Sequence, residues 1–117
     1  MEYSTYITAH KKREAERKAA LEQSRLVASA IAEQIAAMLR CDFGATEVYL
    51  FGSTLRHGEF HAHSDIDLAA NGIPSQDYFT AVFQALRMAG EFSVDLLQLA
   101  ACRPALRHAI LREGIKL

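Results

Sequence analysis

Three aspartates stand out in this chain because their pattern suits the binding of a cation. Asp65 and Asp67 lie two residues apart at the start of an apolar run, and Asp95 lies in a later one. Successive side chains of a strand point to opposite faces, so Asp65 and Asp67 would leave the same face. Two carboxylates this close repel each other unless a cation lies between them. Hard oxygen ligands suit Mg²⁺, which proteins usually bind with one or two carboxylates together with substrate phosphates.

A Gly-Ser pair, Gly52 and Ser53, follows the apolar run 47–51. Glycine lets the backbone approach a phosphate closely, and the serine hydroxyl and the following amides can donate hydrogen bonds to its oxygens. Asp95 is an ionisable residue inside an apolar run, where burial is costly without a cation or a donor, so we expect it to be the third carboxylate. Asp-x-Asp and Gly-Ser are each common in turns, and only their combination predicts a site.

The surrounding sequence predicts helices alternating with short strands. Residues 8–40 lack glycine and proline and are rich in strong helix formers. The expected elements, in chain order, are a helix over 8–40, strands over 47–51 and 66–70, a helix between Ser75 and Gly90, a strand over 92–99 and a helix between Pro104 and Gly114. This order predicts an α/β (α+β) fold with helices packed on a small sheet.

Helical spacing of apolar residues predicts which helix faces are buried. The second half of the first helix has an apolar face, whereas residues 11–18 are mostly charged and are expected to be solvated. A nucleic-acid contact for this basic stretch is the alternative, but Glu14 and Glu16 dilute its positive charge. In the helix after Ser75, the apolar residues at helical spacing predict a buried stripe made of Phe79, Val82, Phe83 and Leu86.

The length of one connection predicts how the first two strands pair. The 11 residues 54–64 separate Ser53 from Asp65, fewer than the dozen or more that a parallel crossover needs. We therefore expect these strands to be antiparallel, which brings Gly52-Ser53 beside Asp65 and Asp67, and we expect the sheet to be mixed. Residues 1–117 should form one domain, with an N-terminal helix over 8–40 and a core over 47–117.

The composition argues against a nucleic-acid-binding, membrane-spanning or disulfide-rich protein. With 117 residues, a net charge of −1 and a pI near 6.5, the chain has no overall electrostatic attraction for nucleic acid or an anionic membrane. No apolar run approaches the length of a membrane span, so we expect a soluble cytoplasmic protein. Cys41 and Cys102 are too few and too far apart for a disulfide framework or a thiolate zinc site, and we expect both to be reduced and mostly buried.

These motifs together resemble those of the minimal nucleotidyltransferases of the DNA polymerase beta superfamily. The matching segments are Phe51-Gly52-Ser53, then Arg56 and Gly58, then Ser64-Asp65-Ile66-Asp67-Leu68 and Val94-Asp95-Leu96-Leu97. The resemblance extends over about residues 47–117. The loop is one residue longer than is common in that family, with His57 between Arg56 and Gly58.

The resemblance implies a role for each motif residue. Gly52 and Ser53 would hold the triphosphate of ATP, with Arg56 and Ser64 as further nucleotide contacts. The three catalytic, metal-binding residues would be Asp65, Asp67 and Asp95. The first two would bind two Mg²⁺ ions, and Asp95 would complete the catalytic metal site and accept a proton from the acceptor hydroxyl.

The resemblance also implies an acceptor and a partner. Minimal members of the family are typically antitoxins that transfer AMP from ATP to a tyrosine of a HEPN toxin and also bind it, so we expect a protein AMPylator of a type VII-like toxin-antitoxin pair. The long N-terminal helix is a plausible contact for this toxin. Both a homo-oligomer and a hetero-oligomer with the toxin stay open.

Three alternatives stay open at the level of sequence. The chain could neutralise its toxin by binding alone, although the Gly-Ser pair and all three acids are present. It could transfer a nucleotide to a small-molecule hydroxyl, for which the sequence shows no second domain. Finally, His57, His61 and His63 could form a zinc site with Asp65, but no closed set of four ligands with the spacing of a structural site is visible, which favours surface histidines in a polar loop.

Overall fold

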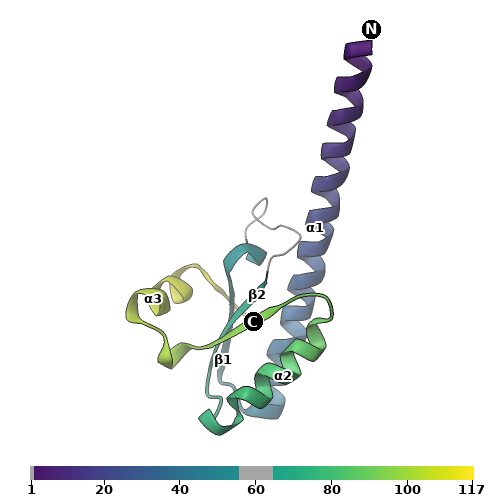
Figure 1. The fold of residues 1–117 in the computed structure, drawn as a ribbon. Coiled ribbons are helices and arrows are strands. Elements are labelled where there is room, and N and C mark those ends of the chain that lie inside the picture. The colour runs from purple at the N-terminus through teal and green to yellow at the C-terminus, as the bar shows by residue number, and fades with distance from the viewer. Residues whose placement is uncertain (1, 56–64) are drawn as a thin grey trace.

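The computed structural model describes residues 2–55 and 65–117 (Figure 1). Its elements, in chain order, are α1 (Glu2–Phe43), β1 (Glu47–Phe51), the 3₁₀ helix η1 (Gly52–Leu55), β2 (Ile66–Asn71), the 3₁₀ helix η2 (Ser75–Asp77), α2 (Tyr78–Ala89), β3 (Val94–Gln98), the 3₁₀ helix η3 (Leu99–Ala101), α3 (Pro104–Glu113) and β4 (Ile115–Lys116). The four strands form one sheet in the order β3-β2-β1-β4. β1 is antiparallel to β2 and β4, whereas β2 and β3 are parallel. The mixed sheet and the antiparallel first pair confirm the predicted fold.

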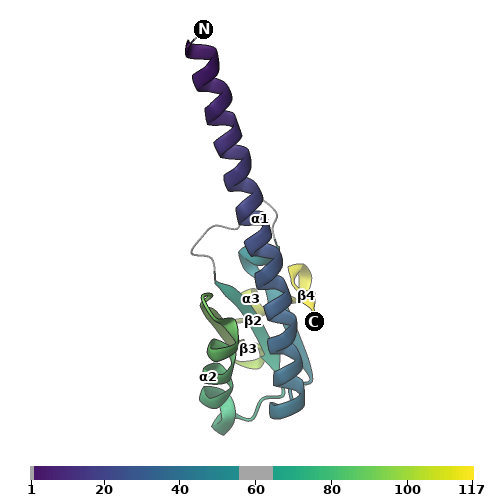
Figure 2. The ribbon, with the colours of Figure 1, turned by 90° about the vertical axis from the view of Figure 1, so that its right-hand side faces the viewer.

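The sheet has a different set of helices on each face (Figures 1 and 2). On one face, α1 and α2 cover the main core, to which the strands contribute Val48, Leu50, Ile66, Leu68 and Leu96. The opposite face carries the alternate strand residues, and there a smaller cluster includes Ala69, Leu99 and Ile110, the last from α3. Because Asp67 and Asp95 alternate with buried residues of the main core, they belong to the α3 face.

Only the C-terminal half of α1 packs on the sheet. Ala28, Ala32, Ile35 and Leu39 are fully buried there, whereas the N-terminal half extends beyond the rest of the molecule (Figure 1). The helix begins and ends a few residues outside the predicted range 8–40, and it stops before Gly44, whose φ of +74° suits glycine. The prediction that the helix is buried late and solvated early is confirmed.

The predicted buried stripe of α2 is wrong at three of its four residues, and only Val82 packs partly buried against the main core. Phe79 and Phe83 are 74% and 69% exposed, and Leu86 is 40% exposed. The buried face is instead formed by three alanines at four-residue spacing, namely Ala81, Ala85 and Ala89. Small side chains let α2 lie close against α1, which also buries alanines, so the bulkier apolar stripe points to solvent. Both stripes have helical spacing, and periodicity alone does not say which one faces the core.

Smaller differences concern the strand ends and the cysteines. β3 is shorter than the predicted 92–99 at both ends, with Leu99 beginning η3, and the two-residue strand β4 was not predicted. Cys41 is exposed in the last turn of α1, contrary to expectation, whereas Cys102 is half-buried and donates to the Gln98 carbonyl at 3.4 Å. In the described ranges, no helix has the combination of length and apolar character that crossing a bilayer requires.

Candidate active site

The pairing register of the sheet brings the predicted acids together. In the parallel pair β2 and β3, Asp67 lies directly opposite Asp95, and in the antiparallel pair β1 and β2 it lies opposite Phe51. Asp65 immediately precedes β2. Asp67 is half-buried, whereas Asp65 and Asp95 are exposed. β3 is an edge strand, and the Asp95 carboxylate on it is in contact with solvent.

The surroundings of Asp67 disfavour its ionised form. Burial, with the nearby negative charges of Asp95 and Asp65, raises the pKa of Asp67 to about 6. Both effects disfavour the ionised carboxylate, and the two like charges act on it only because they are close. A cation at this position would offset both effects.

Gly52 lies against the Asp67 carboxylate. A Cβ atom added to Gly52 would lie 2.2 Å from Asp67 Oδ2, and the φ of Gly52 is +81°. Only glycine meets both demands, because a side chain would be strained at this φ and would also displace the carboxylate. The Gly-Ser pair therefore adjoins the acids, as predicted from the antiparallel pairing of the first two strands. Ser53 follows in η1.

The remaining predicted nucleotide contacts, Arg56 and Ser64, lie outside the described residues. So do the three histidines of the alternative zinc site, His57, His61 and His63. Their roles stay predictions.

Sequence analysis missed the residues that anchor η1. Thr54 is fully buried, and its hydroxyl donates to the Asp65 carbonyl at 3.3 Å. Arg25 of α1 donates from Nη1 to the Thr54 carbonyl at 3.0 Å, and two further hydrogen bonds of 2.9 and 2.7 Å join its guanidinium to Glu22. The i,i+3 spacing of Glu22 and Arg25 predicts that they pair on the helix. No local pattern predicts the contact of Arg25 with Thr54, because these residues are 29 apart in the sequence.

The chemistry of the acids fits a hard divalent cation. Asp67, with Asp65 or Asp95 beside it, supplies the one or two carboxylates that Mg²⁺ usually takes from a protein when phosphates provide further ligands. Within residues 2–55 and 65–117, no three His, Cys, Asp or Glu side chains are grouped closely enough to hold one metal ion, so a cation here would take at most two of these carboxylates and its other ligands from phosphates.

Comparison with known proteins identifies the family. Residues 33–117, most of the chain, match the family described as polymerase beta, nucleotidyltransferase. The chain belongs to the polymerase beta nucleotidyltransferase family. This confirms the resemblance seen in the sequence motifs. Among curated proteins, none matches this chain significantly.

Solved structures with the same fold include a minimal nucleotidyltransferase and proteins of toxin-antitoxin complexes. One described as a minimal nucleotidyltransferase is 29% identical with a TM-score of 0.58, and the match covers 83% of this chain and 95% of that one. A toxin-antitoxin structure with AMP-PNP is 25% identical, with a TM-score of 0.60 and coverage of 73% and 70%. The MNT antitoxin in complex with the tri-AMPylated HEPN toxin of Shewanella oneidensis is 22% identical, with a TM-score of 0.57 and coverage of 76% and 70%.

The contact between Gly52 and Asp67 leads to a first prediction. In Gly52→Ala, the new Cβ should push the Asp67 carboxylate away, and nucleotidyl transfer should fall about 100-fold, as is typical of a misplacement of about 1 Å. Gly44→Ala is the matched control, because Gly44 has a similar positive φ but open space around it. It should cost only about 1–2 kcal/mol of stability. Equal losses of transfer in both variants would show that backbone strain, and not the clash, is responsible.

The raised pKa of Asp67 leads to a second prediction. Because the pKa is higher in the folded state, the free energy of unfolding should fall as pH rises from about 4 to about 6. Asparagine cannot ionise, so Asp67→Asn should be more stable than the unaltered chain at pH 7.5, by about 1 kcal/mol after allowance for solvent screening. The gain should vanish near pH 4. Urea unfolding at both pH values measures it, and a pH-independent gain would contradict the assignment.

Proposed function

We propose that this chain transfers AMP from ATP to a tyrosine hydroxyl of a HEPN toxin, in a Mg²⁺-dependent reaction in the cytoplasm, and so acts as the antitoxin of that toxin. The observation that carries the proposal is the convergence of Gly52, Asp67 and Asp95 within a polymerase beta nucleotidyltransferase fold. The structural likeness to a toxin-antitoxin protein with AMP-PNP, at 25% identity, supports ATP as the nucleotide and a toxin as the partner.

The reaction is a displacement at the α-phosphorus of ATP. A bond forms between the acceptor oxygen and this phosphorus, the bond to the β-phosphate oxygen breaks, and pyrophosphate leaves. Asp95 is exposed on the edge strand beside Asp67, so an approaching hydroxyl can reach it and transfer its proton to the carboxylate. The backbone at Gly52 and Ser53, where η1 begins, would hold the phosphates.

Asp67 would hold Mg²⁺ together with Asp65 or with Asp95, and the substrate phosphates would supply further ligands. The cation, when bound, would neutralise the phosphate oxygens and the charge on the leaving pyrophosphate. The protein's own contribution is to place the carboxylates. Thr54 fixes the backbone of Asp65, the sheet register fixes Asp67 against Asp95, and Gly52 leaves room for the carboxylate of Asp67.

A partner assay tests the proposed function. The chain is incubated with ATP, Mg²⁺ and the product of the adjacent reading frame, and mass spectrometry follows the addition of AMP to a tyrosine. Asp67→Asn and Asp95→Asn should each lower transfer at least about 100-fold, because each removes a carboxylate at the reacting centre. EDTA should abolish transfer, and Mg²⁺ should restore it. Asp42→Asn, an exposed acid at the end of α1, is the matched control and should transfer AMP normally.

Two outcomes would contradict this function. Full transfer by Asp67→Asn or Asp95→Asn would remove these residues from the reaction. A tight complex between the two unaltered proteins without any addition of AMP would show instead an antitoxin that acts by binding alone.

A further inference from the structure

The exposed apolar face of α2 has no role in the chemistry described so far. Phe79, Phe83 and Leu86 follow one another at helical spacing on the side of α2 that faces away from the alanines packed in the core. Phe79 and Phe83 keep about 70% of their surface in contact with solvent, as given above. Aromatic side chains that stay exposed forgo a large favourable free energy of burial. A contiguous exposed apolar patch therefore marks an interaction site.

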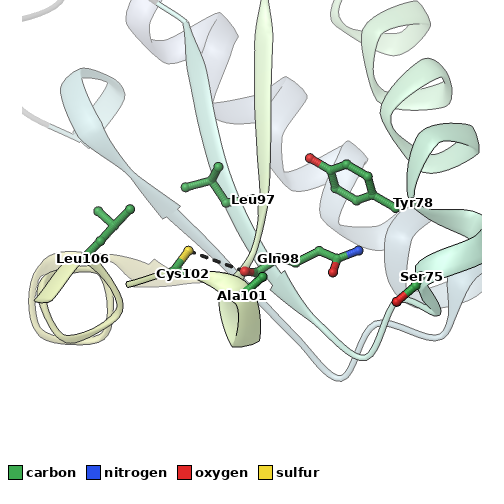
Figure 3. Close-up of a pocket in the computed structure, with 7 residues that line it drawn as sticks. All are labelled: Ser75, Tyr78, Leu97, Gln98, Ala101, Cys102 and Leu106. Atoms are coloured by element: carbon green, nitrogen blue, oxygen red, sulfur yellow. Dashed lines mark hydrogen bonds between the residues drawn. The ribbon is translucent and has the colours of Figure 1, made fainter. Parts of the chain in front are cut away.

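A hollow of about 410 Å³ lies beside this face, across the end of β3 (Figure 3). It is lined by residues of β3, the turn that follows, α3 and the start of α2, namely Leu97, Gln98, Ala101, Cys102, Leu106, Ser75 and Tyr78. Leu106 and Tyr78 stand on opposite sides of the edge strand, so the hollow straddles this strand (Figure 3). Most of the lining is apolar, and the Tyr78 hydroxyl donates to the Leu96 carbonyl, which holds the ring at the rim.

The hollow and the exposed face of α2 are continuous. The rings of Tyr78 and Phe79 are in edge-to-face contact, with centroids 5.5 Å apart and planes at 66°. Tyr78 lines the hollow, and Phe79 begins the exposed stripe. We call the combined area the α2–β3 surface and define it by the aromatic residues Tyr78, Phe79 and Phe83 with Leu97 and Leu106.

This surface adjoins the acceptor side of the active site. Asp95 and Leu97 are two residues apart on β3, so they share a face of the sheet and lie about 7 Å apart along the strand. Gly52 follows β1, on the other side of β2. In an in-line displacement, the attacking and leaving oxygens are on opposite sides of the phosphorus. If the phosphates lie at Gly52, the acceptor must approach from the β3 side, across the exposed edge of the sheet.

We propose that the α2–β3 surface is the docking site for the protein that supplies the acceptor hydroxyl. The occupant is a protein surface with apolar side chains around its tyrosine, one of which enters the hollow while the hydroxyl reaches Asp95. This inference rests on the proposed function, because the acceptor hydroxyl is the one named there. The surface is continuous with the strand that carries Asp95, which distinguishes it from the exposed apolar residues Leu26 and Val27 on α1.

The test compares two double variants, each of which replaces two exposed apolar side chains with serine. Phe79→Ser with Phe83→Ser removes the aromatic stripe, and Leu26→Ser with Val27→Ser removes apolar residues that are 50% and 43% exposed on α1. For each full-length chain, calorimetry measures the affinity for the HEPN partner and for AMP-PNP with Mg²⁺. The same proteins are then assayed for KM and kcat of AMP transfer.

We expect the aromatic double variant to bind the partner about 30-fold more weakly or worse, as for the loss of an aromatic hot spot. KM for the partner should rise in parallel, with kcat and AMP-PNP affinity little changed. The α1 double variant should match the unaltered chain, and a greater loss of partner affinity in it than in the aromatic double variant would place the docking site on α1 and overturn the proposal. Leu106→Ser, at the other side of the hollow, should also lower the affinity for the partner and leave the affinity for the nucleotide unchanged.

The possible failures are distinguishable. If the unaltered chain transfers AMP and the aromatic double variant binds and transfers equally well, the docking site is wrong and the proposed function stands. If neither the unaltered chain nor any variant transfers AMP, but the aromatic double variant binds the partner more weakly than the unaltered chain does, the docking surface stands and the proposed function fails. If the unaltered chain alone is a dimer and Phe79→Ser with Phe83→Ser makes it a monomer, a second copy occupies the surface and the proposal is overturned.

Discussion

The contact between the Asp67 carboxylate and the backbone of Gly52 is the constraint on which the active site depends. It joins the end of β1 to the start of β2, and it leaves no room for a side chain at position 52. The same carboxylate lies opposite Asp95 across the parallel pair, so one residue belongs to both halves of the site. Burial and two neighbouring negative charges make its ionised form costly. The site is therefore built with an excess of negative charge that favours a cation.

The rest of the fold holds this contact in place. The main core packs α1 and α2 on one face of the sheet, which leaves the acids on the face that α3 only partly covers. Arg25 links α1 to the carbonyl of Thr54, and the Thr54 hydroxyl links η1 to Asp65. The long N-terminal helix thus has a second role besides its place in the core, because it anchors the turn that follows Gly52.

The sequence predicts the architecture and the site better than it predicts which surfaces are exposed. The antiparallel pairing of β1 and β2 follows from the short connection between Ser53 and Asp65. The convergence of the acids follows from the alternation of side chains along a strand. Exposure depends instead on packing between distant elements. The alanine face of α2 is buried because α1 accommodates it closely, and Asp95 is exposed because β3 is an edge strand. The link from Arg25 to Thr54 spans 29 residues and has no local signature.

The most direct measurement is the pKa of Asp67 by carbon-detected NMR of its side-chain carboxyl, in the free chain and with AMP-PNP and Mg²⁺. The geometry predicts a value of about 6 in the free chain. It also predicts a fall below the ordinary value of about 3.9 when the nucleotide and cation bind, because a nearby positive charge favours the carboxylate. A pKa of Asp67 that does not fall when AMP-PNP and Mg²⁺ are added would contradict a cation site at Asp67.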